Sequence, residues 1–85
     1  MAGAIYSEEQ RAVADAFVKA RQSAKMRQID LAAKIGKHQS YISDIERGQR
    51  RIDVLELFAI AHALGINPTD LYAQLTKNIS ANFRL

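Results

Sequence analysis

The sequence predicts an all-α fold of five short helices, and three observations lead to that prediction. Apolar residues recur at helical spacings of three and four in five separate segments. Three of the four glycines, and the single proline, stand at the ends of these segments rather than inside them. No stretch alternates apolar and polar residues as a strand would, and 85 residues are too few for a second core. One compact domain over residues 1–76, followed by a tail over residues 77–85, is therefore expected.

The first two helices are marked by their end residues as well as by periodicity. Ser7 followed by Gln10 is typical of a capping box, which predicts a first helix over about residues 8–25. A second helix is expected to start near Arg27 or Gln28 and to end at Gly36, which suits the left-handed position after a helix. The apolar residues of these two helices are Val13, Phe17, Ala20 and Ala24, then Leu31, Ala32 and Ile35.

The other three helices follow the same pattern. The third is expected to end at Gly48 and the fourth at Gly65. The fifth begins with Asn67 as its cap and Pro68 at its first position. The tail KNISANFRL has no periodicity, so it is either loose or packed on a partner. The apolar residues of these helices are Ile42 and Ile45, then Leu57, Ile60, Ala61 and Leu64, then Leu71 and Leu75.

Composition excludes several functional classes. The chain has no Cys, which excludes disulfides and thiolate metal sites and suits a reducing cytoplasm. Its N-terminus, MAGAIYSEEQ, lacks a basic region followed by an apolar run, so no secretory signal is expected. No stretch approaches the roughly 20 apolar residues that a membrane span needs. These features predict a cytoplasmic protein with no membrane partner.

Charge is distributed unevenly along the chain. Residues 25–51 contain seven basic and three acidic residues, whereas residues 52–76 contain three acidic residues and no Lys or Arg. A basic face opposite an acidic one is typical of polyanion binding on one side of a domain. An ordinary scatter of solvated charges is the alternative.

The segment KHQSYISDIERG, residues 37–48, contains poor helix formers within a predicted helix. If Ile42 and Ile45 point inward, the polar residues between and before them point outward. A helix fits the DNA major groove, where Gln can bind adenine with two hydrogen bonds and Asp can accept from cytosine. The predicted base-reading residues are Gln39, Ser40, Ser43 and Asp44. As alternatives, Gln39 and Ser40 are merely exposed first-turn residues, and Asp44 pairs with Arg47.

Residues 28–47 also fit a helix-turn-helix, with small Ala32 where two helices approach and Gly36 where the chain reverses. From about residue 17 to residue 72 the chain resembles the Cro and phage-repressor type of helix-turn-helix domain. This XRE-like, lambda-repressor-like family consists of five-helix transcriptional regulators. The resemblance is carried by Arg21, RQIDLAAKIG, QSYISDIERG and LFAIAHALGINPTDLY. Lys37 departs from it, because an apolar residue usually follows the Gly.

The resemblance implies a role for each part of the motif. The third helix would enter the major groove, and Gln28 at the start of the second helix would meet a phosphate. Arg21 and Glu46 would form an ion pair that fixes the third helix. Basic residues at the rim would supply affinity through counterion release. Tyr41 either binds a phosphate or packs on the first helix, and His38 is either a cap or a phosphate contact. The predicted phosphate contacts are Gln28, Lys37, His38, Tyr41, Arg47, Arg50 and Arg51.

A homodimer is expected, because one short helix reads too few base pairs to select a site in a genome. Leu55 and Phe58 fall on a different side of the fourth helix from its core residues. An apolar patch for a second copy would contain Leu55, Phe58, Tyr72 and Leu75, with Ile79 and Phe83 of the tail. Alternatively, Phe58 completes the core and the tail alone mediates association.

The leading hypothesis is a sequence-specific regulator that binds a palindromic operator in double-stranded DNA as a homodimer. Restriction–modification controllers are similar in size, and QSYISDIERG resembles their recognition region. The alternative is an antitoxin-like interaction module that binds DNA secondarily, although a tail of nine residues is short for wrapping a toxin. Enzymatic activity, a metal and a cofactor are not expected, because His38 and His62 lack ligand spacing and no activated nucleophile or phosphate loop is present. No small-molecule ligand is expected at this length.

Overall fold

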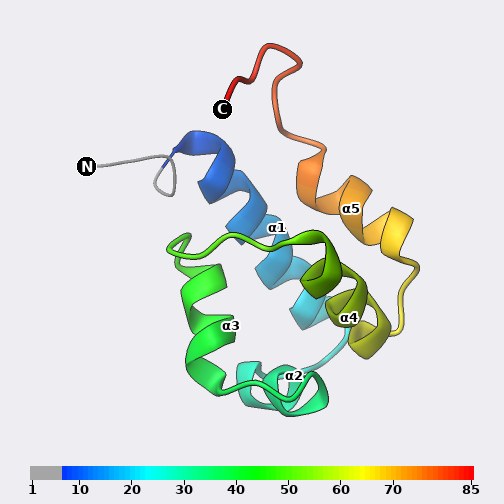
Figure 1. Cartoon of the computed structure of the whole chain (residues 1–85). Helices are drawn as coiled ribbons and strands as arrows, with labels where there is room; N and C mark the ends of the chain where they lie inside the picture. Colours follow the sequence, from blue (N-terminus) through cyan, green and yellow to red (C-terminus); the bar gives the residue numbers. More distant parts are fainter. Residues whose placement is uncertain (1–6) are drawn as a thin grey trace.

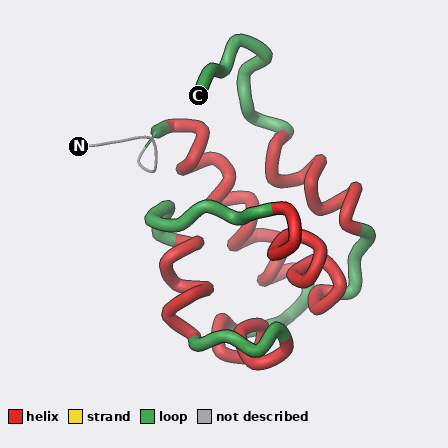
Figure 2. Tube along the Cα trace, viewed as in Figure 1, coloured by secondary structure: helices red, strands yellow, loops and turns green. Residues whose placement is uncertain are grey.

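The computed structural model describes residues 7–85, and within that range it contains five helices and no strand (Figures 1 and 2). This confirms the all-α prediction. The N-terminus, on which the absence of a secretory signal was predicted, lies outside the described residues. No helix of residues 7–85 is both long enough and apolar enough to cross a membrane. The helices are α1 (Glu8–Ser23), α2 (Gln28–Lys34), α3 (Gln39–Glu46), α4 (Val54–Leu64) and α5 (Pro68–Thr76).

Side chains cap the starts of four helices. Ser7 Oγ accepts from the backbone N–H of Gln10 at 3.1 Å, and Asn67 Oδ1 accepts from Thr69 at 2.8 Å. The predicted capping box at α1 is only half formed, because Gln10 does not bond back to the cap. Its side chain is buried beneath the loop after α3 and donates to the carbonyl of Arg50 at 3.3 Å. A full capping box joins Asp53 and Glu56 at the start of α4.

The first helix ends at Ser23, two residues earlier than the sequence predicts. Lys25 has a φ of 60°, in the left-handed region that a side chain seldom adopts. Gly36 occupies the same region with a φ of 71°, and its position after α2 follows the prediction. The sequence does not predict this early end of α1, because lysine, unlike glycine, is not typical of the left-handed position after a helix.

In the core, α1 lies between the pair α2 and α3 and the pair α4 and α5. It packs against α3 on one side and α5 on the other, while α2 packs on both α3 and α4 (Figure 1). Leu31 of α2 meets Ile42 and Ile45 of α3 in this core, and all three are at most 1% exposed. These contacts hold α3 by its apolar side and leave its polar side in solvent. The buried core residues are Ala14, Phe17, Ala20, Leu31, Ala32, Ile42, Ile45, Ile60, Ala61, Leu64, Leu71 and Leu75.

Candidate nucleic-acid interface

The accessible side of α3 gathers the residues predicted to read bases. Gln39 and Ser40 are exposed and Ser43 and Asp44 are half-buried, while the two isoleucines of the helix face the core. Their spacing of one, four and five residues places all four on one side of a helix about two turns long. This side therefore offers donors and acceptors to a surface that lies against it.

A buried ion pair joins α1 to the end of α3. Glu46 Oε2 accepts from Arg21 Nε at 2.6 Å and Oε1 accepts from Nη2 at 3.0 Å, so the pair is bidentate. The two side chains are only 11% and 7% exposed. Arg21 also donates to the carbonyl of Met26 at 2.7 Å, in the turn before α2. One guanidinium thus holds α1, the start of α2 and the end of α3 together.

Hydrogen bonds continue from this pair to the recognition surface. Gln28 Nε2 donates to Glu46 Oε1 at 2.9 Å, and Gln28 Oε1 accepts from Gln39 Nε2 at 3.2 Å. The series Arg21–Glu46–Gln28–Gln39, here called the relay, therefore fixes which atoms of Gln39 stay free. Its carbonyl oxygen and one amide hydrogen have no partner within the relay. Local sequence patterns do not predict the last two bonds, because each joins Gln28 of α2 to a residue of α3.

Asp44 pairs with Arg47, which was the alternative to base reading. The Arg47 guanidinium donates to the Asp44 carboxylate and also to the Ser43 hydroxyl. Both charged side chains remain about half exposed, at 54% and 40%. A surface pair three residues apart contributes only a few tenths of a kcal/mol, so it can be exchanged for another partner.

Arg50 is engaged with Glu56 and Tyr41, although the sequence predicted a phosphate contact for it. Its guanidinium forms an ion pair with the Glu56 carboxylate and lies 4.5 Å from the centre of the Tyr41 ring. Burial and the neighbouring Glu56 carboxylate raise the pKa of Tyr41 to about 12. Burial would raise the pKa of Glu56, but bonds from Asp53, Tyr41 and Arg50 hold it below its ordinary value.

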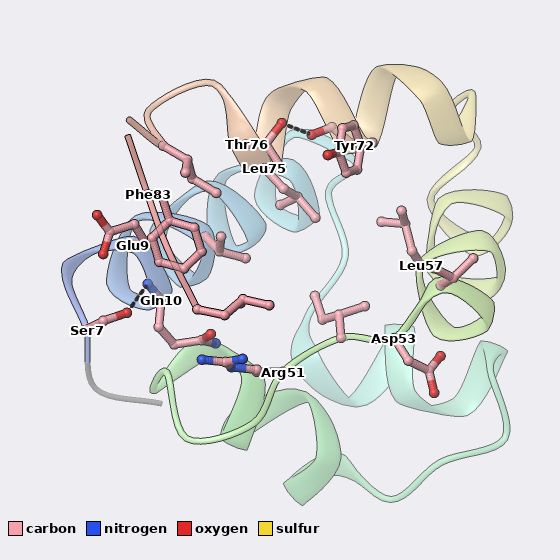
Figure 3. A pocket seen from close by; sticks show the side chains of 15 residues that line it. Ser7, Glu9, Gln10, Arg51, Asp53, Leu57, Tyr72, Leu75, Thr76 and Phe83 are labelled. Carbon is pink, nitrogen blue, oxygen red and sulfur yellow. Dashed lines mark hydrogen bonds between the residues drawn. The ribbon is translucent and has the colours of Figure 1, made fainter. Parts of the chain in front are cut away.

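The remaining predicted phosphate contacts lie around α3. Lys37 is exposed, with its ammonium 5.2 Å from the centre of the Tyr41 ring. His38 caps α3: its Nδ1 accepts from the Ser40 backbone at 3.4 Å, while Nε2 has no bond within residues 7–85. Arg51 is exposed in the loop that leads to α4, and it lines a groove that the tail forms with α1 (Figure 3). Lys37 before α3 and Arg47 after it place a cation at each end of the α3 surface.

The apolar side of α4 is the second candidate surface. Leu55 is 80% and Phe58 61% exposed, and Tyr72 of α5 is 59% exposed. Phe58 thus does not complete the core; its ring stacks on His62 at 6.4 Å. Leu75 was predicted for this surface, but it is buried to 6% exposure and belongs mainly to the core.

The tail folds back on its own domain. Together with α1, α4 and α5 it encloses a groove of about 280 Å³ (Figure 3). Phe83 lies beside the first turn of α1, while Tyr72 and Leu75 line the groove from α5 (Figure 3). Within the tail, Ile79 is half-buried while Phe83 is 37% exposed and Leu85 is fully exposed, so the tail lines the groove but stays largely in solvent. Across residues 7–85, no group of three His, Asp or Glu side chains is placed to hold a metal ion.

Comparison with known proteins gives consistent matches. A family described as helix-turn-helix matches residues 18–71. The control protein C.BamHI of Bacillus amyloliquefaciens is 44% identical over 48 residues, which cover 56% of this chain and 59% of that protein. The chain thus spans less than two thirds of that relative.

Solved structures match over nearly the whole chain. The wild-type restriction-modification controller protein C.Esp1396I has a TM-score of 0.74 and 32% identity, covering 86% of this chain and 95% of that one. The tetramer of the same protein in complex with its natural 35 base-pair operator has a TM-score of 0.72 and 31% identity, covering 84% and 93%.

Proposed function

The chain belongs to the helix-turn-helix family of XRE-type, DNA-binding transcriptional regulators, and from this premise we propose that it is a homodimeric, controller-like regulator of a palindromic operator. The observation that carries the proposal is the polar side of α3, which is free of core contacts and flanked by cations. The controller C.Esp1396I binds its operator as a tetramer, which supports self-association on DNA here. Nothing in the structure favours the antitoxin alternative.

In the proposed complex, α3 lies in the major groove. Gln39 reads an adenine with its free carbonyl oxygen and amide hydrogen, the two groups that the relay leaves available. Ser40 and Ser43 donate to or accept from neighbouring bases. Asp44 exchanges Arg47 for a cytosine amino group, which frees that arginine for a phosphate.

Phosphate contacts surround this helix in the proposal. Gln28 donates one amide hydrogen to Glu46, so its second hydrogen is available for the DNA backbone. His38 can donate through Nε2, and the Tyr41 hydroxyl can donate to a phosphate after giving up its bond to Glu56. The proposed contacts are Gln28, Lys37, His38, Tyr41, Arg47 and Arg51, whereas Arg50 is engaged by Glu56 and Tyr41.

Two-fold symmetry follows from the small reach of one recognition helix. We place the dimer contact on the exposed Leu55, Phe58 and Tyr72, with Leu75 supporting them from the core. Residues 52–76, which carry this surface, contain no Lys or Arg, so the surface would not attract DNA phosphates. Burying these side chains removes a large apolar patch from water, which favours association.

Selection of bound sites from random DNA tests the proposal directly. We expect a palindrome to be enriched, with half-sites about 10–11 base pairs apart, one turn of the duplex. A library that shows no enrichment after repeated rounds would contradict sequence-specific binding, and a single asymmetric site would contradict the dimer.

Replacing Gln39 by alanine tests base reading. We expect Q39A to lose discrimination at one position of each half-site by about 1–3 kcal/mol, because the bidentate contact is removed. Affinity for nonspecific DNA should stay nearly constant, since this side chain carries no charge. Gln22→Ala, on the exposed side of α1, is the matched control. Titration of single-base operator variants gives the readout; an equal loss on every sequence would rule out base reading by Gln39.

A further inference from the structure

Glu56 joins the start of α4 to the basic loop that follows α3. It lies in the first turn of α4, where its Oε1 accepts from the Asp53 backbone at 2.9 Å. Its other oxygen accepts from Arg50 in the basic loop. The Glu56 side chain is 17% exposed, and it is therefore less accessible than the exposed Asp70 of α5. A charge this poorly solvated needs a fixed partner, and Arg50 supplies it.

Arg50 is held from several directions. Gln10 of α1 bonds its carbonyl at 3.3 Å, Glu56 binds its guanidinium, and the guanidinium lies over the Tyr41 ring at 4.5 Å. Its Nε is buried and has no hydrogen-bond partner in the described structure. The Arg50 side chain is still 41% exposed, but its guanidinium is docked on α3 and α4 through Tyr41 and Glu56.

Docking Arg50 has opposite effects on specific and nonspecific DNA binding. A free loop cation would strengthen binding to every sequence, because each phosphate contact releases counterions. Because Arg50 is paired with Glu56, it does not bind the phosphates of random DNA. At the same time it packs on Tyr41, whose position on α3 decides where the tyrosine hydroxyl meets DNA.

We propose that Glu56 is a positioning residue that raises the ratio of specific to nonspecific DNA binding, by holding Arg50 on the Tyr41 ring and away from phosphates. This inference rests on the proposed function, since it needs a preferred sequence. Glu56 itself touches no DNA in this arrangement. It acts through Arg50, so the two residues are coupled.

The test measures affinity for the selected operator and for a random duplex of equal length, over a series of salt concentrations. The variants are Glu56→Gln, Arg50→Gln and the double variant E56Q/R50Q. Asp70→Asn is the matched control, because it also removes one negative charge from the first turn of a helix. Circular dichroism melting establishes that each variant is folded.

E56Q is expected to bind random DNA more tightly and operator less tightly. The released Arg50 should steepen the salt dependence on random DNA by about 0.9 per protomer, which at 0.1 M salt corresponds to at most about eightfold tighter binding. D70N should leave that slope unchanged, and the double variant should return it to the wild-type value. The proposal would be overturned if E56Q and D70N changed the salt dependence equally. It would also be overturned if E56Q lost the same affinity for operator and for random DNA.

R50Q decides the question even if E56Q fails to fold. Because the docked Arg50 makes no phosphate contact, R50Q should keep the wild-type salt slope, whereas Arg51→Gln should flatten it by about 0.9 per protomer. A flatter salt dependence of DNA binding in R50Q would refute the inference while leaving the proposed function intact. A wild-type protein that binds both duplexes equally would refute the proposed function itself.

Discussion

Replacing Glu46 by alanine is expected to lower the free energy of unfolding by about 3–5 kcal/mol, the range found when one partner of a buried ion pair is removed. Arg21 would keep its charge at a site where its side chain is only 11% exposed, with one remaining bond to the Met26 carbonyl. Domains of this kind are stable by about 5–15 kcal/mol, so the variant would be partly unfolded on moderate warming.

Urea unfolding followed by circular dichroism measures the effect. Asp15→Ala is the matched control, because it breaks an exposed pair with Arg11, 3.9 Å apart, and should cost less than about 1 kcal/mol. The double variant Arg21→Met/Glu46→Leu should recover much of the stability, since it removes both charges together. A loss in E46A no larger than in D15A would contradict a stabilising role for the buried pair.

Replacing Phe58 by aspartate is expected to abolish self-association and to weaken operator binding by about 10²–10⁴-fold. The proposed patch would receive a charge at its centre, where burial against a partner leaves it unsolvated. Each protomer would then bind its half-site alone and lose the gain that comes from linking two sites. The fold should survive, because the Phe58 side chain is 61% exposed in the protomer.

Sedimentation at micromolar concentration gives the oligomeric state, and titration of the full operator and of a half-site gives the affinities. Ile29→Asp is the control for sedimentation, because Ile29 is also apolar and 52% exposed but lies on α2. If F58D and I29D sediment like the wild type, the dimer surface proposed on α4 is wrong. If F58D binds a half-site as tightly as the wild type does, its weaker operator binding comes from the loss of self-association alone.

Local signals in the sequence were enough to predict the five helices. Periodicity located their apolar sides, and Gly36, Gly48, Gly65 and Pro68 located ends. The end of α1 was missed because Lys25 adopts a left-handed φ that the turn into α2 requires. Local patterns could not reveal such an end, since tertiary packing selects that conformation.

The site was predictable only where it depends on one helix. Two isoleucines fix the orientation of α3, so its outward residues could be named in advance. The engagement of Arg50 by Glu56 could not be predicted, because it depends on how the loop returns to α4. The same holds for the bonds of Gln28 to Glu46 and Gln39, which cross between helices.

The relay also has a consequence for the kinetics of binding. Gln39 is oriented before DNA arrives, so little side-chain rearrangement is needed after encounter. Correct and incorrect sites would then be met at similar rates, set by diffusion and by the attraction of the basic rim. A wrong base would leave the fixed amide unpaired and shorten the lifetime of the complex. Discrimination between operators would therefore reside in how long the protein stays bound.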